Sequence, residues 1–269
     1  MYEFDQVVKK MREFFHSRGF VEVHPQDRLS ILAACEDPTT ISTFDYAGQT
    51  WPLPQTNQMW LEHEILQNPE VKGLFCVTTS YRNEANPIPG RHDLIFPLFE
   101  FETHGGMETL LQLEKDLLTH LGYDPSTFAE GDYKDVCAKY GVHELDNEHE
   151  ERLEQDYGPV FFLKNFPQHT SPFWNMKKGE GDTYRKVDVI LSGIETFGSA
   201  ERSTSVDEMR NDFYNISDGL YAKLLYSKFS KQRVDAELEK FLSYNFVERC
   251  GGGIGVGRLV KSMKKLGLL

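Results

Sequence analysis

Arginines and carboxylates gather in residues 77–102, on two segments whose composition predicts β-strands. Arg82 and Glu84 lie two apart at the end of the first segment, and Arg91, Glu100 and Glu102 follow on the second. Residues two apart on a strand face the same side, so these charges would crowd one face of a hairpin. Surface ion pairs contribute only about 0 to 1 kcal/mol each, so stability alone is a weak reason for the cluster. The pattern favours a site for a bound anion beside a cation or amine, and a charged surface hairpin is the alternative.

The order of these residues resembles motif 2 of the class II aminoacyl-tRNA synthetases, in their aspartate/asparagine branch. The matching residues are Tyr81-Arg82-Asn83-Glu84, Arg91-His92, Phe96, Glu100 and Glu102. The resemblance implies that Arg82 contacts the α-phosphate of ATP and that Glu84 and Phe96 lie at the adenine. It places Arg91 near the outer phosphates, with His92 in the same ATP-binding set. Guanidinium groups bind phosphate oxygens in pairs, and aromatic rings stack on bases.

Residues 251–263 resemble motif 3 of the same family. The glycines of Gly251-Gly252-Gly253-Ile254-Gly255 would let a turn of the backbone close over the nucleotide. The resemblance implies that Gly255 borders ATP and that Arg258 stacks on adenine and reaches the γ-phosphate. Gly257 stands where the tRNA ligases of this branch commonly have an acid, which makes the string more similar to ammonia-dependent asparagine synthetases.

Residues 187–202 predict a buried strand followed by a Gly/Ser turn that carries one acid and one arginine. The stretch resembles a synthetase segment in which Glu195 would coordinate the Mg²⁺ that bridges the ATP phosphates and Arg202 would face the amino-acid side chain. Ser199 is the expected second metal contact, because Gly198 stands where many aspartyl enzymes have serine. Mg²⁺ needs only one or two protein carboxylates. A purely structural turn is the alternative.

Residues 53–62 resemble the aspartyl-enzyme segment that binds the substrate's α-amino group, with Thr56 and Gln58 at the binding positions. Glu100 would supply the carboxylate for the same amino group. A plain helix N-terminus at Thr56 is the alternative. Leu61 replaces a lysine of the aspartyl enzymes, and Ile95 replaces a glutamate of the asparaginyl enzymes. Both changes predict a less polar side-chain pocket and leave the identity of the amino acid open.

Helices and a sheet must position these groups. Apolar spacing predicts helices over residues 4–17, 58–66, 107–120, 210–229 and 233–244, two acidic helices within 132–156 that form a possible insertion, and strands near 20–23 and 160–163. Residues 4–25 resemble motif 1, the family's dimer interface, and residues 29–51 read as a loop over the site. We expect one α+β domain over residues 1–269, with an antiparallel sheet flanked by helices.

Composition limits the classes of protein that fit. The chain has 269 residues, 39% of them hydrophobic, which is enough for one buried core. No apolar run approaches the roughly 18 residues of a membrane span, so we expect a soluble cytoplasmic protein. Cys35, Cys76, Cys137 and Cys250 form no CxxC pair and are expected to be buried free thiols. The net charge of −13 disfavours tRNA as a partner.

The favoured hypothesis is an AMP-forming ligase similar to asparagine synthetase A and its archaeal counterparts. It would use ATP and Mg²⁺ to join an aspartate-like amino acid to ammonia or another amine. Motif 2 begins near residue 80, which leaves no room for an anticodon-binding barrel of roughly 100 residues ahead of it. The alternatives are a truncated synthetase that charges a tRNA or a carrier protein, and an inactive regulatory paralogue. We expect a homodimer, because helix 4–17 offers a large apolar face.

Overall fold

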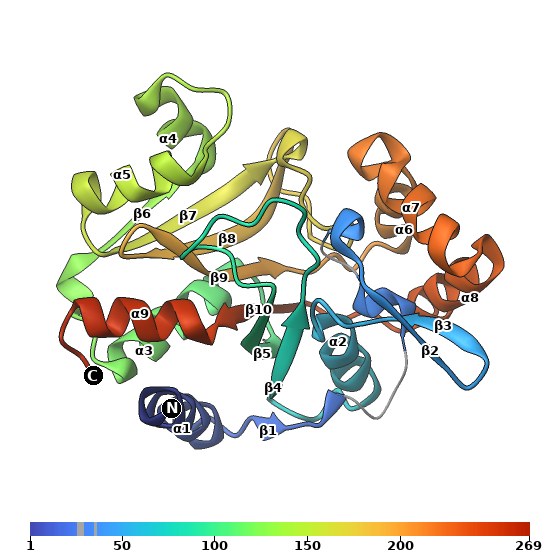
Figure 1. Ribbon diagram of the computed structural model, residues 1–269, viewed down its shortest axis with the longest axis horizontal. Coiled ribbons are helices and arrows are strands. Elements are labelled where there is room, and N and C mark those ends of the chain that lie inside the picture. The colour runs from blue at the N-terminus through green and yellow to red at the C-terminus, as the bar shows by residue number, and fades with distance from the viewer. Residues whose placement is uncertain (26–29, 35–36) are drawn as a thin grey trace.

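The computed structural model describes residues 1–25, 30–34 and 37–269. Its centre is an eight-stranded sheet in the order β1-β4-β5-β10-β9-β8-β7-β6 (Figure 1). The strands are β1 (Val21–Glu22), β4 (Gly73–Tyr81), β5 (Ile95–His104), β6 (Phe128–Asp132), β7 (Val160–Pro167), β8 (Thr183–Leu191), β9 (Ile194–Glu201) and β10 (Arg249–Gly255). Neighbours from β4 to β7 pair antiparallel, and β1 and β6 pair parallel at the two edges. The predicted α+β fold with an antiparallel sheet is confirmed.

Three helices cover one face of this sheet: α1 (Tyr2–Ser17), α3 (Met107–Leu121) and α9 (Val256–Lys265). Their apolar side chains share one core with Phe99, Phe101 and Phe197 of the strands. The apolar face of α1, including Phe14 and Phe15, is therefore already covered within the chain. The apolar face that suggested a homodimer is therefore not free, and the homodimer itself stays a prediction.

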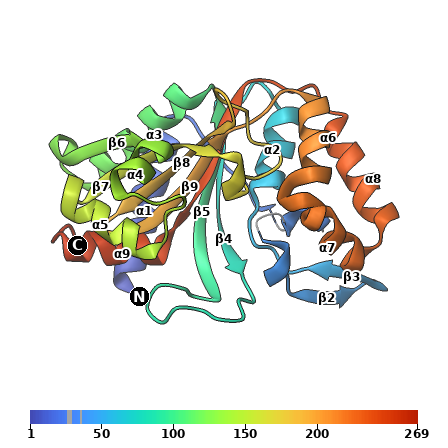
Figure 2. The same cartoon turned by 90° about the horizontal axis from the view of Figure 1, so that it is seen from above.

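The opposite face carries α2 (Gln58–Gln67) and a group of three helices, α6 (Val206–Asn215), α7 (Leu220–Phe229) and α8 (Lys231–Leu242). Figure 2 shows these helices on the other side of the sheet from α1, α3 and α9. They pack around the buried ring of Trp174 in a second core. The helix predicted over 210–229 is in fact two helices, because Ser217 and Asp218 adopt left-handed φ values of 53° and 55°.

The acidic stretch forms α4 (Tyr133–Tyr140) and α5 (Asn147–Tyr157), as its spacing predicted. Gly141, with φ of 71°, ends α4, and a capping box of Asp146 and His149 begins α5. Both helices pack on β7, and α5 also packs on β8, through a third small core that includes Leu153 and Phe161. The charged stretch is thus a docked pair of helices, and whether it is an insertion stays a prediction.

Other sequence-based expectations about local structure were also wrong. The loop expected over 29–51 contains short 3₁₀ turns and a hairpin of β2 (Thr43–Tyr46) and β3 (Gln49–Pro52), closed by two left-handed residues, Ala47 and Gly48. Residues 194–201, expected as a turn, are strand β9. Arg82 and Glu84 follow the end of β4, although the Arg82 N–H still donates to the Leu94 carbonyl at 2.8 Å.

The thiols follow the prediction where the structure describes them. Cys76, Cys137 and Cys250 are buried and unpaired, and Cys35 lies outside the described residues. In the part of the chain that the structure describes, no helix has the length and apolar character needed to cross a membrane.

Glu114 of α3 is a buried carboxyl group in the core below the sheet. Neither of its oxygens has a hydrogen-bond partner among the described residues, because the nearby Ser199 hydroxyl donates instead to the Val187 carbonyl at 3.2 Å. Burial raises the pKa of Glu114 from 4.5 to about 8, although Ser199 opposes the shift. The folded chain therefore holds this proton more tightly than the unfolded chain, and stability is lost as the pH rises from about 5 to about 8.

We expect Glu114→Gln to stabilise the protein by about 2 kcal/mol at pH 8 and by much less at pH 5, since it removes the ionisation. Urea unfolding at the two pH values measures the difference. Glu108→Gln, an exposed change on the same helix, is the control. Equal effects of Glu114→Gln at both pH values would contradict the assignment.

Candidate active site

Successive residues on strands β5, β10 and β9 point alternately to the two faces of the sheet. One face is packed against helices, and the other carries polar groups. Phe99, Phe101 and Phe197 point to the helices α1, α3 and α9. The residues between them point the other way: Glu100 and Glu102 on β5, Gly251 and Gly253 on β10, and Gly198 on β9. The polar face is therefore open at its centre, where glycines on β10 and β9 lie opposite one another and opposite Glu100.

The glycines of residues 251–255 lie within β10 and not in a turn, which corrects the expectation from the sequence. A Cβ added at Gly251 would overlap the Glu102 carboxylate and the Phe101 carbonyl oxygen. A Cβ at Gly253 would point toward Glu100 across the open face. Side chains at these positions would fill the space between β5 and β9, so glycine keeps that space available.

A β-bulge decides the direction of Glu195. Val189 of β8 pairs with Phe197, but Ile190 pairs with Glu195, so Thr196 is an extra residue on β9. In a regular strand Glu195 would share the helix-covered face of Phe197. The bulge returns its carboxylate to the polar face, on the same side as Arg202.

One cavity of about 250 Å³ lies on the polar face, between the loop of residues 82–94 and the start of α9. All eight residues that the sequence assigned to ATP line it. They are Arg82, Glu84, Arg91, His92, Phe96, Glu195, Gly255 and Arg258. Asp93 and Thr196 also line this cavity and were not predicted. Its content of guanidinium groups and one aromatic ring suits a nucleoside triphosphate.

We call this first cavity, lined by Arg82, Phe96 and Arg258 among others, the nucleotide cavity after its predicted ligand. Contacts inside it hold its arginines in place. The Arg82 guanidinium lies 5.4 Å from the centre of the Phe96 ring, and Glu84 Oε2 lies 2.7 Å from His92 Nδ1. Arg258 Nη1 donates to the Glu195 carbonyl at 2.6 Å, and its Nη2 donates to the Arg91 carbonyl at 3.3 Å. Arg258 therefore joins the loop after β4 to the first residues of β9.

A second cavity of about 370 Å³ continues from the first, because Glu195, Gly198 and Gly253 line both. Thr56, Gln58 and Arg202, which the sequence assigned to the amino acid, line this second cavity. Its outer wall comes from residues 171–176 and from the start of α7, and is mainly apolar: Phe173, Trp174, Met176, Ile216, Leu220, Tyr221 and Leu224. We call it the amino-acid cavity.

Glu100 was predicted to bind the amino group, and its carboxylate is engaged by neighbouring residues of the chain. It is fully buried and lines neither cavity. Its carboxylate accepts hydrogen bonds from the Thr56 hydroxyl, from the Asn57 N–H at 2.9 Å and from the Thr78 hydroxyl at 2.7 Å. Glu100 thus fixes the start of α2 from outside the two cavities. In doing so it also fixes the position of Gln58, which lines the amino-acid cavity.

Arg202 belongs to a buried charge network that the sequence only partly revealed. Its Nη2 donates to Gln58 Oε1 at 2.7 Å and lies 3.3 Å from Glu102 Oε2. Glu62 Oε1 lies 3.6 Å from Arg202 Nε, and Glu62 Oε2 accepts from Arg249 Nη2 at 2.6 Å. Burial raises the pKa of Glu102, while Arg202 opposes the shift.

Sequence reasoning missed Glu62 and Arg249. The available signal for Glu62 was its spacing from Gln58, because residues four apart lie on one face of a helix. Leu61, which suggested a less polar pocket, packs in the core, and Ile95 is exposed outside both cavities. The polarity of the pocket therefore does not follow from these two positions.

Ser199 was predicted as a metal contact, which stays a prediction: the residue lines the amino-acid cavity, but its hydroxyl is engaged elsewhere. Its hydroxyl lies on the helix-covered face and donates to the Val187 carbonyl. Asp188 is the better partner for Glu195: a Cβ at Gly198 would lie 3.2 Å from Glu195 Oε1 and 3.8 Å from Asp188 Oδ1. Both carboxylates thus border the same space, which sequence reasoning missed because Asp188 belongs to the preceding strand.

The charge at Asp188 fits a bound cation. Its Oδ1 is buried without a hydrogen-bond partner among the described residues, and Lys186 Nζ holds its Oδ2 at 2.7 Å. Burial raises the pKa of Asp188, Lys186 opposes the shift, and Glu195 adds to it. The described residues bring no group of three or more His, Cys, Asp or Glu side chains into metal-binding geometry. Two carboxylates nevertheless suffice for Mg²⁺, which keeps most of its waters.

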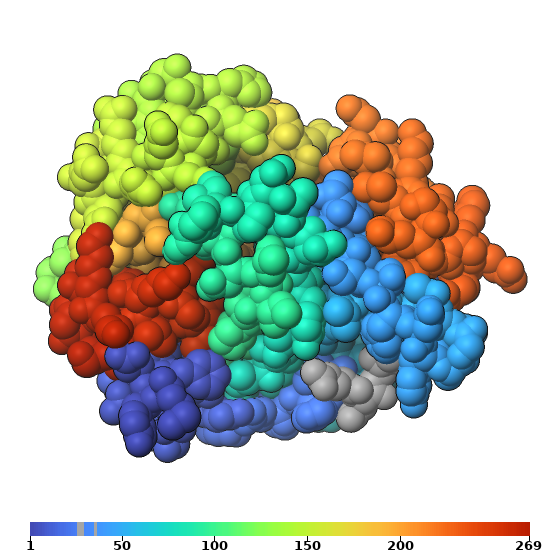
Figure 3. Space-filling view, in the orientation of Figure 1, coloured from blue at the N-terminus to red at the C-terminus, as the bar shows by residue number. Residues whose placement is uncertain are grey.

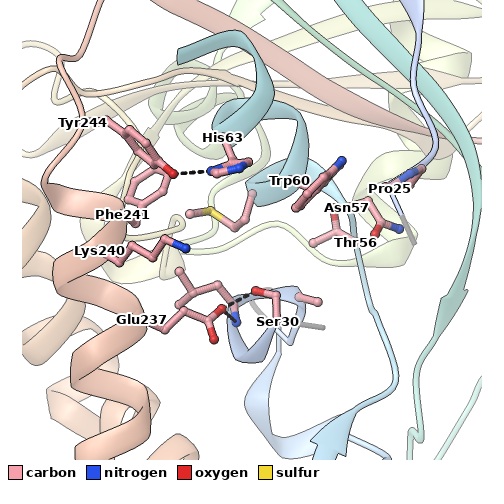
Figure 4. A pocket seen from close by; sticks show the side chains of 13 residues that line it. Pro25, Ser30, Thr56, Asn57, Trp60, His63, Glu237, Lys240, Phe241 and Tyr244 are labelled. Atoms are coloured by element: carbon pink, nitrogen blue, oxygen red, sulfur yellow. Dashed lines mark hydrogen bonds between the residues drawn. The ribbon is translucent and has the colours of Figure 1, made fainter. Parts of the chain in front are cut away.

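A third, small cavity lies behind the start of α2 (Figure 4). Its volume of about 40 Å³ has room for about one water molecule, so it is no substrate site. Glu237 of α8 accepts hydrogen bonds there from the Ile31 N–H at 3.0 Å and the Leu32 N–H at 3.1 Å. Tyr244 and His63 form a hydrogen bond on the other side. These contacts tie residues 30–32 and α2 to the helical group that walls the amino-acid cavity.

The antiparallel sheet, with two joined cavities on one face, has the architecture of a class II synthetase-like fold. The model of the family "tRNA synthetases class II (D, K and N)" matches residues 2–267, so the chain belongs to this family.

Individual relatives agree with that membership. The chain is 24% identical to an aspartate–tRNA(Asp) ligase of Pyrobaculum aerophilum, over 96% of this chain and 62% of that protein. It is 24% identical to an asparagine–tRNA ligase of Streptococcus suis, over 92% of this chain and 61% of the relative. The chain thus spans less than two thirds of the length of these relatives.

A solved structure shares the fold. The asparaginyl-tRNA synthetase of Pyrococcus horikoshii, complexed with asparaginyl-adenylate, superposes with a TM-score of 0.80 and 20% identity. The match covers 99% of this chain and 65% of that one.

Proposed function

We propose that the chain activates an amino acid as its acyl-adenylate at the expense of ATP. The observation that supports this most directly is the junction of the two cavities at Glu195, Gly198 and Gly253. An amino-acid carboxylate in one cavity and the α-phosphate of ATP in the other would meet there. A carboxylate oxygen would attack the α-phosphorus, the bond to the β-phosphate oxygen would break, and pyrophosphate would leave.

The chain's own groups fit such a step. Arg82, Arg91 and Arg258 line the nucleotide cavity and can neutralise charge that builds on the phosphates. The attacking carboxylate is ionised at neutral pH, so no general base is needed, and holding both reactants supplies much of the rate. Asp188 and Glu195 would hold Mg²⁺, which would offset the negative charge of the polyphosphate.

Arg202 supports a substrate whose side chain offers an acceptor oxygen. It lines the amino-acid cavity, and Gln58 and Glu102 fix its guanidinium in place. The named relatives act on aspartate or asparagine, which fits this chemistry. We therefore propose an aspartate-like amino acid as the substrate of one catalytic domain over residues 1–269.

Two observations bear on the acceptor of the activated amino acid, and they favour different answers. The named relatives are tRNA ligases, which favours transfer to a tRNA and places that alternative ahead of the amine-dependent ligase. The net charge of −13 is the observation that favours ammonia or another small amine.

We expect amino-acid-dependent pyrophosphate–ATP exchange with one member of a panel of amino acids and with no RNA present. Exchange with none of them would contradict the adenylation step. Adding total tRNA or ammonium then separates the acceptors by the product, an aminoacylated 3′ end or a free amide.

The dependence of activity on salt concentration distinguishes the two possible acceptors independently. A tRNA-dependent reaction should lose activity steeply between about 50 and 200 mM salt, because several phosphate contacts release counterions, whereas an amine-dependent one should change little. Exchange without any acceptor, followed over the same salt range, is the control.

A further inference from the structure

Arg91 lies between the nucleotide cavity and helix α5. One side of the residue lines the cavity, and only 9% of its side chain is exposed. On the other side, Glu150 of α5 accepts a hydrogen bond from Arg91 Nη2. Glu150 does not line the cavity, so it holds Arg91 from the side of α5. Arg91 Nη1 lies 3.5 Å from the Gly193 carbonyl oxygen and 3.8 Å from Oε1 of the more exposed Glu151.

The same carboxylate oxygen has a second partner. Glu150 Oε2 also accepts the backbone N–H of Glu195 at 3.0 Å. One side chain therefore fixes both an arginine from the loop after β4 and the first residues of β9. Neither position is adjacent to Glu150 in the sequence, so the link exists only in the folded chain.

Helix α5 provides a rigid base for this contact. Leu153 is fully buried, and Glu154 Oε2 lies 2.7 Å from Lys265 Nζ of α9. Gly193, between β8 and β9, approaches so closely that an added Cβ would lie 3.0 Å from the Glu151 Cα. Figure 3 shows the α4–α5 surface, in yellow-green, adjoining the blue-green surface of the loop that carries Arg91.

We propose that Glu150 is a positioning residue that holds Arg91 in place for the outer phosphates of a nucleoside triphosphate. This inference rests on the proposed function, since it assigns Arg91 to those phosphates. An arginine with little exposed surface needs an acceptor to replace its lost hydration and to fix its orientation, and Glu150 supplies one near the start of α5. The acidic stretch thereby becomes part of the nucleotide subsite.

The test compares nucleotides with and without the outer phosphates. We expect Glu150→Gln to weaken ATP binding by about tenfold or more, measured by calorimetry with Mg²⁺, because a misplaced guanidinium loses its phosphate contact. AMP binding should change less than about twofold, which a general loss of structure would not produce. Glu148→Gln, an exposed change on the same helix, is the matched control and should leave both affinities unchanged.

A second substitution tests the route through Arg91. In an Arg91→Ala background, Glu150→Gln should add no further loss of ATP affinity, because the group it positions is absent. An additive loss, or equal losses for ATP and AMP, would overturn the proposal. Wild-type protein that binds neither nucleotide would overturn the proposed function and this inference with it. Wild-type binding together with unchanged ATP affinity of Glu150→Gln would overturn the inference alone.

Discussion

Arg258→Ala lowers amino-acid-dependent pyrophosphate–ATP exchange by about two or more orders of magnitude, which is the expected loss when one charge-assisted donor is removed from a reacting phosphate. Arg258 is the group that links the two segments of the nucleotide cavity, through the carbonyls of Glu195 and Arg91. Its loss removes a cation from the site and also releases these backbone contacts. Initial rates of exchange, at saturating amino acid and varied ATP, measure the effect.

Lys264→Ala is the matched control for this experiment. Lys264 is a cation on the same helix, but it is exposed and lies 2.8 Å from Glu3 Oε1 at the surface, away from both cavities. Its replacement should leave exchange within about twofold of wild type, since exposed ion pairs contribute little. Arg82→Ala should reproduce the loss seen with Arg258→Ala. Folded Arg258→Ala protein with near-normal exchange would remove Arg258 from the site.

Arg249→Met should destabilise the fold by about 3–5 kcal/mol, because it removes the cation that donates to the buried Glu62 carboxylate and leaves Arg202, at 3.6 Å, as the cation beside it. Arg249 and Glu62 are both fully buried, and the guanidinium donates to Glu62 Oε2 through Nε at 3.0 Å and Nη2 at 2.6 Å. Asn175 holds the other oxygen of Glu62 at 2.6 Å. The free energy of unfolding in urea measures the cost.

The double variant Glu62→Leu/Arg249→Met distinguishes two effects on stability. One is the loss of the Glu62–Arg249 ion pair, and the other is the cost of a buried Glu62 carboxylate that has lost Arg249. Replacing both members of a buried pair by apolar side chains is often neutral, so the double variant should recover most of the stability lost by Arg249→Met. Arg210→Ala, which breaks an exposed pair with Glu239, should cost less than about 1 kcal/mol and is the control. A double variant as unstable as the single one would show that Arg249 acts by packing and not by charge.

Local signals in the sequence led to the fold class and to eight residues that line one cavity, whose role in binding ATP stays a prediction. The helices of residues 2–17, 58–67 and 107–121 follow from apolar spacing that 3.6 residues per turn places on one face. The residues assigned to ATP come from short segments in which order and spacing carry the pattern, and the fold brings all of them to one cavity. The type and order of residues were sufficient to find this set of cavity-lining residues, because each short segment contributes several side chains to the same cavity.

Which groups share the polar face depends on pairing between segments that are far apart in the sequence. In a regular strand, the side chains of Glu195 and Arg202 would point to opposite faces of the sheet. A β-bulge that depends on pairing with β8 places both on the same face. The same pairing turns the Ser199 hydroxyl away and brings Asp188 to Glu195. Glu62, Arg249 and Glu150 gain their partners from segments far away in the sequence. Register and docking of distant elements are cooperative results of packing, and no local spacing encodes them.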